Sequence, residues 1–270
     1  MNAQPRKPDF LGEQFAARFQ DQSVVDRYHL RATYPPETFR LLADLVVDEP
    51  RAVLDAGCGT GDVARHLLEY AERIDAVDIS LPMLEKGKTL PGGDSPKIRW
   101  LHGKIEEVEL EPPYALITAG QSLHWMNWDL VLPRFQHILT PGGSLAILDV
   151  ETMPTTWDDA LIQIVKRYSS NKAYQPYALF DELERRQLFQ KIGDQFTAPV
   201  TFEQSIQDRI EAMHAQSSLS RDGMTADKIE GFHQEIETLL SPYTHHGKIT
   251  LQVMGHLVWG RPLNPAKDIV

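Results

Sequence analysis

Cysteine is almost missing from this sequence of 270 residues, in which Cys58 is the single one. One cysteine cannot form an internal disulfide bond. Proteins in reducing compartments usually lack disulfide bonds. The sequence also lacks a run of about 18 apolar residues, the length that a membrane-spanning helix needs. The polar stretch Met1–Asp9 has no apolar signal-peptide core. We therefore expect a cytoplasmic protein without a membrane partner.

An excess of positive charge is missing as well. The 27 Lys and Arg residues face 38 Asp and Glu residues, which gives a net charge of -11. Proteins that bind nucleic acid usually present a basic face, so we do not expect a nucleic-acid partner. The ten histidines are scattered without metal-ligand spacing, so we expect no metal. A small-molecule ligand is the remaining expectation, and nothing in the sequence indicates the oligomeric state.

Three glycines stand at alternate positions in the segment Val53–Gly61, which reads V-L-D-A-G-C-G-T-G. Two apolar residues end a buried strand, and after the glycines a helix is expected to begin near Asp62. Glycine lets a ligand approach the main chain closely, and a helix N-terminus attracts negative groups. This pattern predicts a nucleotide-like ligand. The dinucleotide fingerprint needs a further glycine where Asp62 stands, which disfavours an NAD(P)-dependent oxidoreductase.

Several short apolar runs alternate with helical patterns and predict a doubly wound α/β fold with a parallel sheet. The expected strands are 52–56, 73–77, 98–102, 114–118 and 145–150. Asp78 directly follows the second strand. An acid at this position can accept hydrogen bonds from both hydroxyls of a ribose.

Val53–Gly61 resembles the first motif of the class I S-adenosylmethionine (SAM)-dependent methyltransferases. Later segments resemble that family too: Ile79–Leu84 after the acid, and Leu139–Gly143 before the fifth strand. His124-Trp125 resembles the small-molecule branch that includes trans-aconitate and ubiquinone or menaquinone pathway enzymes. The resemblance implies a Rossmann-like sheet of seven strands, with strand seven antiparallel, an N-terminal helical lid and helical cap insertions.

The expected organisation follows from this resemblance and from the helical patterns. A lid at 1–48, with helices at 10–33 and 37–47, precedes a SAM-binding core at 49–150. Residues 151–261 hold cap helices at 157–169, 179–189, 206–216 and 225–241, together with strand six at 196–202 and strand seven at 248–259. A tail follows at 262–270. Gly255 suggests a bulge or a break in strand seven.

The resemblance also implies the residues that bind SAM and its product S-adenosylhomocysteine. They are Asp55, Ala56, Gly57, Gly59, Gly61, Asp78, Ile79, Met83, Lys104, Ile105, Ala119 and Gly120, with Arg27 and Tyr28 from the lid. Arg31 is a further candidate for the cofactor carboxylate. Lys104 stands where the family often has an acid, and its ammonium cannot accept a hydrogen bond from the adenine amino group. The backbone of Ile105 is the remaining acceptor there.

The implied reaction is an in-line SN2 transfer of the methyl group to a small-molecule acceptor. His124 acts either as a base or, together with Trp125, only packs under the adenine or braces the loop. Candidates for contact with the acceptor are Trp125, Trp157, Tyr174, Tyr177, His214 and Gln216. The acidic total charge and these aromatic residues favour a neutral or cationic acceptor. The alternative is a SAM-binding protein without methyl transfer, either a scaffold or a cyclase.

Overall fold

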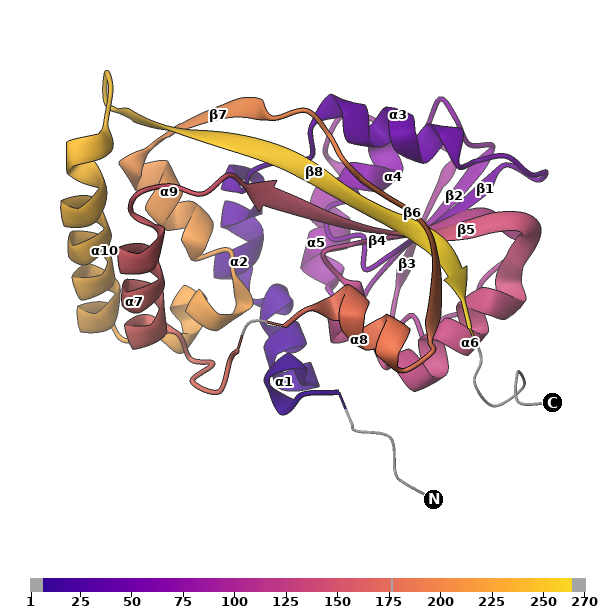
Figure 1. Cartoon of the computed structure of the whole chain (residues 1–270), viewed down its shortest axis with the longest axis horizontal. Coiled ribbons are helices and arrows are strands. Elements are labelled where there is room, and N and C mark those ends of the chain that lie inside the picture. The colour runs from indigo at the N-terminus through magenta and orange to yellow at the C-terminus, as the bar shows by residue number, and fades with distance from the viewer. Residues whose placement is uncertain (1–6, 176, 264–270) are drawn as a thin grey trace.

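A mixed β-sheet with helices on both faces lies at the centre of the protein in the computed structural model, which describes residues 7–175 and 177–263 (Figure 1). In the described residues the sheet has eight strands in the order β3-β2-β1-β4-β5-β8-β6, and β7 also pairs with β8. The first five strands are parallel, and β8 is antiparallel to β5. The doubly wound α/β fold is therefore confirmed. These five strands are β1 (Ala52–Ala56), β2 (Arg73–Asp78), β3 (Ile98–His102), β4 (Tyr114–Gly120) and β5 (Leu139–Thr152).

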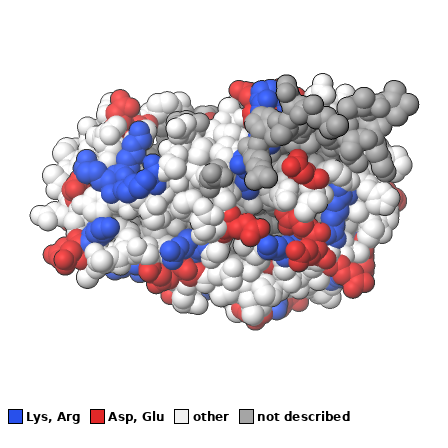
Figure 2. All heavy atoms as spheres, turned by 90° about the horizontal axis from the view of Figure 1, so that it is seen from below, with Lys and Arg blue, Asp and Glu red and all other residues white. Residues whose placement is uncertain are grey.

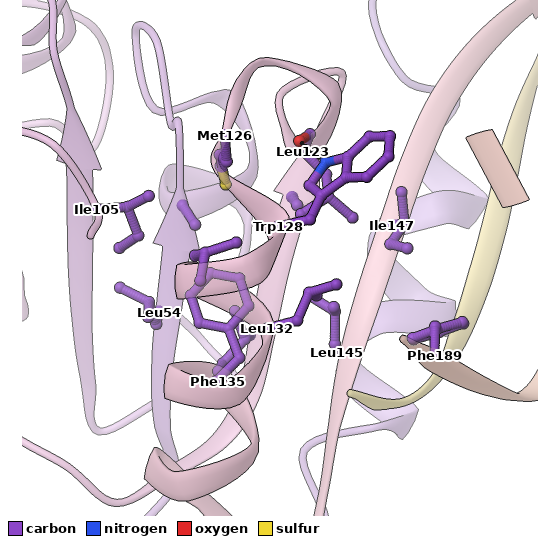
Figure 3. Close-up of a cluster of buried hydrophobic side chains, with 14 of the residues drawn as sticks. Leu54, Ile105, Leu123, Met126, Trp128, Leu132, Phe135, Leu145, Ile147 and Phe189 are labelled. Atoms are coloured by element: carbon purple, nitrogen blue, oxygen red, sulfur yellow. Dashed lines mark hydrogen bonds between the residues drawn. The ribbon is translucent and has the colours of Figure 1, made fainter. Parts of the chain in front are cut away.

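The central strands β1 and β4 are almost fully buried because helices cover both of their faces. On one face lie α3 (Pro36–Asp44), α4 (Asp62–His66) and α5 (Leu81–Lys88), with Phe39 and Leu84 in the buried cluster. The other face is covered by α6 (Trp128–Ile138) and α8 (Leu179–Arg185). Figure 3 shows how Leu132 and Phe135 of α6 turn toward the sheet.

The prediction for strand six is wrong in its position. Residues 196–202 contain the turn between two separate strands, β6 (Phe189–Phe196) and β7 (Val200–Ser205). Both pair with β8 (Lys248–Pro262), β6 beside its second half and β7 beside its first half. The exposed, polar residues of β6 give it little apolar signal, which explains the misplacement.

Gly255 does not interrupt β8, which pairs continuously with β5 from Thr152↔Val253 to Leu145↔Gly260. Instead, a Cβ at Gly255 would lie 2.3 Å from Oγ1 of Thr38 in α3. On the other side, Gly255 N donates to Thr197 Oγ1 at 2.9 Å, between the stretches of β8 that pair with β7 and β6. The glycine is thus needed because α3 approaches the strand closely.

The lid is not the continuous helix expected at 10–33. It consists of five short turns of helix, because the backbone is extended at Gly12 (ψ 162°) and at Asp21 (ψ 128°). These interruptions let Leu11, Val24 and Val25 all turn inward. The pieces are η1 (Asp9–Leu11), α1 (Glu13–Ala16), η2 (Ala17–Gln20), α2 (Gln22–Arg27) and η3 (Tyr28–Leu30).

The cap has a small core of its own at the left of Figure 1. It is built by α7 (Asp158–Tyr168), α9 (Ile206–Met213) and α10 (Ala226–Leu240), around Ile164, Ile210 and Phe232. The short turns η5 (Ser217–Leu219) and η6 (Arg221–Gly223) link α9 to α10, and η7 (Ser241–Tyr243) follows α10. Of the expected tail, Pro262 closes β8, Leu263 N donates to Leu188 O, and 264–270 lie outside the described residues.

Two surface properties complete the fold. Seen from below, basic and acidic side chains are both spread over the same face (Figure 2). Within residues 7–175 and 177–263, no helix is both long and apolar enough to cross a lipid bilayer.

Candidate cofactor and acceptor site

A cavity of about 810 Å³ lies between the lid and the carboxyl ends of the parallel strands. This edge of a doubly wound sheet is where such folds bind their ligands. The loops after β1, β2, β3 and β4 form its floor, and the lid covers it. Residues of the lid and of these loops line the cavity, among them Lys7, Phe19, Tyr28, Arg31, Gly57, Gly59, Asp78, Ile79, Met83, Lys104, Ile105, Gly120, Gln121, Ser122, Trp125, Trp128 and Arg186.

The glycine loop after β1 needs its glycines for two reasons. Gly57, Gly59 and Gly61 have φ values of +71°, +55° and +73°, a region that side chains disfavour. Side chains would also collide, since a Cβ at Gly57 would lie 2.5 Å from Ser122 Cβ and one at Gly61 only 2.3 Å from Trp100 Cη2. Gly57 and Gly59 line the cavity, so a ligand can lie directly against this backbone.

Asp55 supports the loop from below and does not line the cavity. One carboxylate oxygen accepts from Thr118 Oγ1 at 2.9 Å, and the other accepts from Ala64 N at 3.2 Å. Burial raises the pKa of Asp55 to about 7, although both hydrogen bonds lower it. Four other predicted cofactor residues also lie outside the lining: Ala56, Gly61, Ala119 and Arg27.

Asp78 presents its carboxylate to the cavity at the end of β2. Oδ2 accepts from Gly59 N and Oδ1 accepts from Ser80 N, both at 2.8 Å. Each oxygen keeps one lone pair, so the two can still accept from two neighbouring hydroxyls. Burial raises the pKa of Asp78 above its ordinary value. The carboxylate and the glycine backbone beside it fit the ribose of SAM.

The far end of the cavity is lined by Ile79, Met83 and Ile105 and fits a flat apolar ring. Lys104 points to the lid, where its Nζ lies 3.0 Å from Glu13 Oε1. The lysine therefore closes the cavity by an ion pair with the lid. Phe19, which the sequence did not single out, packs edge-on against Trp125 with ring centroids 6.0 Å apart.

The opposite end of the cavity is polar, and hydrogen bonds there join the lid, the end of β4 and β5. Gln121 Oε1 accepts from Arg31 Nη2, and Gln121 Nε2 donates to Asp149 Oδ1, both at 2.7 Å. The guanidinium of Arg31 also lies over the ring of Tyr28, 5.0 Å from its centroid. Sequence reasoning missed Gln121 and Asp149 because no local motif marks a contact between the lid, β4 and β5.

His124 belongs to the 3-10 turn η4 (Leu123–Trp125) beside the cavity but is not part of its lining. Its ring packs on Trp125, with centroids 4.6 Å apart. Burial, followed by the nearby cations Lys7 and Arg31, lowers the pKa of His124 to about 4. The imidazole is therefore neutral at pH 7 and only a weak base.

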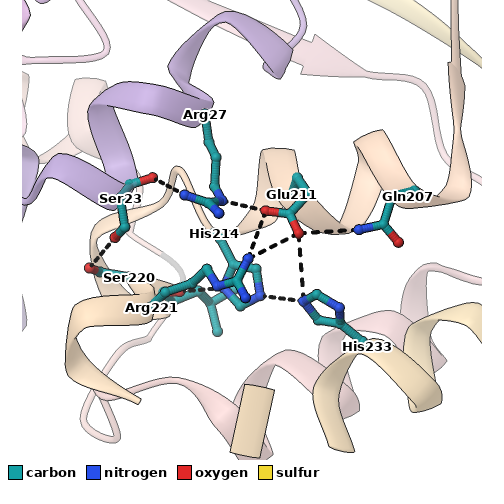
Figure 4. A network of polar contacts seen from close by, with 9 residues as sticks. Ser23, Arg27, Gln207, Glu211, His214, Ser220, Arg221 and His233 are labelled. Atoms are coloured by element: carbon teal, nitrogen blue, oxygen red, sulfur yellow. Dashed lines mark hydrogen bonds and ion pairs between the residues drawn. The ribbon is translucent and has the colours of Figure 1, made fainter. Parts of the chain in front are cut away.

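The remaining residues predicted from the sequence lie away from the cavity, with Trp125 as the exception. Trp157 packs on Tyr243, while Tyr174 and Tyr177 pack on Phe10 of the lid. Gln216 is exposed. Arg27 and His214 belong instead to a network between lid and cap, in which Glu211 pairs with Arg27 and Arg221 (Figure 4).

Two further cations line the cavity that the sequence did not indicate. Lys7 Nζ donates to Met126 O at 3.1 Å, and burial lowers its pKa to about 8. Arg186 lies over the ring of Trp128, 5.2 Å from its centroid. With Arg31 and Lys104 they belong to a lining of mixed charge, which also holds the acids Glu13, Asp78, Glu106 and Asp129. Throughout the described part of the chain, no three His, Cys, Asp or Glu side chains are grouped to hold a metal ion.

Comparison with known proteins agrees with this geometry. Residues 53–143 match the family model described as a methyltransferase domain. A malonyl-[acyl-carrier protein] O-methyltransferase of Halalkalibacterium halodurans is 38% identical over 105 residues, which is 36% of this chain and 38% of that protein. A trans-aconitate 2-methyltransferase of Azoarcus sp. is 30% identical over 122 residues, covering 44% of this chain and 45% of that protein. The chain thus aligns with less than half the length of these curated relatives.

A solved structure supports the fold over nearly the whole chain. A protein from Anaeromyxobacter dehalogenans, described as a type II methyltransferase, superposes with a TM-score of 0.58 at 21% identity. The match covers 86% of this chain and 97% of the other. At this identity the likeness concerns the fold alone.

Proposed function

From its membership of the SAM-dependent methyltransferases, which residues 53–143 carry, we propose that this chain transfers a methyl group from SAM to a small-molecule acceptor. The observation that supports the proposal is one continuous cavity with two chemically different ends. Asp78 and the glycine backbone stand at one end, and Arg31 with Gln121 stands at the other. Such a cavity can hold a nucleoside and a second polar ligand together.

The cofactor of this family is SAM, which supplies a methyl group on a positively charged sulfur when it is bound. In this chain, Asp78 would hold the ribose hydroxyls. The backbone at Gly57 and Gly59 would face the cofactor closely, and Ile79 and Ile105 would enclose the adenine.

The protein's own contribution is orientation and the exclusion of water. Holding two reactants in line replaces a bimolecular encounter and can lower a barrier by about 7 kcal/mol or more. The lid residues Tyr28 and Phe19 line the cavity and would shield the bound reactants from water. His124 is proposed as a brace for Trp125, because its low pKa and its place outside the lining disfavour a base.

An acceptor that needs no base already carries its nucleophilic lone pair, as a carboxylate does. Arg31, which lines the cavity and donates to Gln121 through one nitrogen, can pair with such an anion, so an anion is favoured over the neutral or cationic acceptor expected from the composition. Both relatives named above act, by their names, on acids: malonyl and trans-aconitate. We propose O-methylation of a small carboxylate.

Two measurements test this function. Calorimetry with S-adenosylhomocysteine is expected to show micromolar binding. If no binding is measured, the proposal is wrong. Incubation with methyl-labelled SAM and a panel of carboxylates, with trans-aconitate and malonyl thioesters included, is expected to give a base-labile labelled ester. Cofactor binding without labelling of any acceptor would favour a SAM-binding scaffold or cyclase instead.

A further inference from the structure

We infer that Gln121 is a positioning residue that aims Arg31 into the cavity as a receptor for a carboxylate. The inference rests on the proposed function, since it concerns the same cavity. A carboxylate could come from two sources, the amino-acid end of SAM or the acceptor.

The backbone at Gln121 is strained. Its φ is +51°, a region that non-glycine residues adopt at a cost of about 1 kcal/mol or more. The conformation is held by a hydrogen bond from Gln121 N to Leu148 O at 2.9 Å. A glycine would be free of this strain, but it would lack the carboxamide that bonds Arg31 and Asp149.

The carboxamide of Gln121 has only one possible orientation. A guanidinium only donates and an ionised carboxylate only accepts, so the amide oxygen faces Arg31 and the amide nitrogen faces Asp149. Both contacts measure 2.7 Å. Asp149 Oδ1 in turn accepts from Val150 N at 2.7 Å. The chain Arg31–Gln121–Asp149 is therefore fixed at its far end to the backbone of β5.

Arg31 keeps most of its donors available. Among the described residues, its guanidinium makes one hydrogen bond, to Gln121, while its face lies over Tyr28. The planar fork of a guanidinium matches the two oxygens of a carboxylate. Because Gln121 and Tyr28 hold the group from two sides, the remaining N–H groups are oriented before a ligand arrives.

The test uses Gln121→Met, which keeps the length of the side chain and removes both hydrogen bonds. Gln187→Met is the matched control, because Gln187 is also left-handed (φ +56°) but exposed and outside the cavity lining. Arg31→Met removes the receptor itself. Calorimetry measures three ligands: S-adenosylhomocysteine, 5′-methylthioadenosine, which lacks the amino-acid end, and trans-aconitate added to protein saturated with S-adenosylhomocysteine.

If the carboxylate is that of the cofactor, Gln121→Met weakens S-adenosylhomocysteine about tenfold, Arg31→Met at least as much, and both leave methylthioadenosine unchanged. If it is that of the acceptor, both variants leave the two nucleosides unchanged and weaken trans-aconitate about tenfold. The inference is overturned if Gln121→Met behaves like Gln187→Met with all three ligands, or weakens both nucleosides equally, as a merely structural change would.

Melting temperatures show whether each variant folds. Should Gln121→Met be unfolded, Gln121→Glu replaces it: the new carboxylate occupies Arg31 and is expected to give the same selective losses. A wild-type protein that binds neither nucleoside would instead refute the proposed function, which keeps the two failures apart.

Discussion

The buried carboxyl of Asp55 under the glycine loop lowers the stability of the protein once it is ionised. Its pKa is about 7 in the folded protein against an ordinary 3.8, so the folded state binds this proton more tightly than the unfolded state. Stability therefore falls as pH rises from about 4 through 7, and the full penalty above this window is about 4 kcal/mol.

We predict that the wild-type protein is less stable at pH 8 than at pH 6, by about 1 kcal/mol from Asp55. Asp55→Asn removes the titration and flattens this part of the profile. Urea unfolding at the two pH values measures the difference. A variant that keeps the whole wild-type difference would show that other groups cause it.

Asp78 lines the cavity, unlike Asp55, so its carboxylate is expected to affect ligand binding. Asp78→Asn is predicted to weaken S-adenosylhomocysteine by about 10- to 100-fold, the effect of losing charged hydrogen bonds worth about 1.5–3 kcal/mol. Since burial raises the pKa of Asp78, wild-type affinity should also fall as the pH is lowered and the carboxylate is protonated. Calorimetry from pH 5 to pH 8 measures both effects. Asp94→Asn, at an exposed residue, is the matched control and is expected to change neither.

At the scale of elements, α3 and β8 approach each other closely at Thr38 and Gly255. A Cβ at Gly255 would lie 2.3 Å from Thr38 Oγ1, a buried hydroxyl with no partner among the described residues. Gly255→Ala is therefore predicted to destabilise the protein by about 1–3 kcal/mol. Adding Thr38→Ala removes the colliding oxygen and should recover most of the loss in urea unfolding. Additive losses in the double variant would place the strain elsewhere.

The elements were predictable where burial dictates the residue pattern. Strands β1 to β4 begin where they were predicted, whereas β5 begins earlier, at Leu139. In β1 and β4 both faces are covered, so each reads as a largely apolar run. Prediction failed at β6, an edge strand whose exposed residues carry no such signal, and at the lid, whose apolar residues turn inward only because the chain bends at Gly12 and Asp21.

The site shows the same division. Gly57, Gly59 and Asp78 stand in a local motif, and the structure brings all three to the cavity. Gln121 and Asp149 have no motif, since their roles arise only when the lid, β4 and β5 meet. Cap residues such as Trp157 and Tyr177 were expected near the acceptor because they are aromatic, but they pack inside the cap or against the lid.

For the whole molecule, the lid is held to the core by apolar packing of Val24 and Val25 on Met83, and to the cap by ion pairs. Glu211 of α9 is half-buried and pairs with both Arg27 of the lid and Arg221. Burial raises the pKa of Glu211, but Arg27 and Arg221 outweigh this and leave it below its ordinary value. By contrast, the Lys104–Glu13 pair to the core is exposed, and such pairs contribute about 0–1 kcal/mol.

We predict that Glu211→Gln loosens the lid, because the half-buried Arg27 and Arg221 lose their anion. Hydrogen exchange should accelerate in residues 22–30, and S-adenosylhomocysteine should dissociate several-fold faster. Glu230→Gln, on the exposed side of α10, is the matched control and should change neither. Unchanged exchange in Glu211→Gln would mean that the lid is held by its apolar contacts alone.

The long strand β8 also has a consequence for the order of events during synthesis. It is the last element in the described chain, yet β5, β6 and β7 all pair with it. Until about residue 262 has left the ribosome, the edge of β5 stays open and the other two strands have no partner. The sheet therefore closes late, and an open edge of this kind invites association with other chains. Nascent chains that stall before Lys248 should consequently depend on chaperones, whereas the completed chain should not.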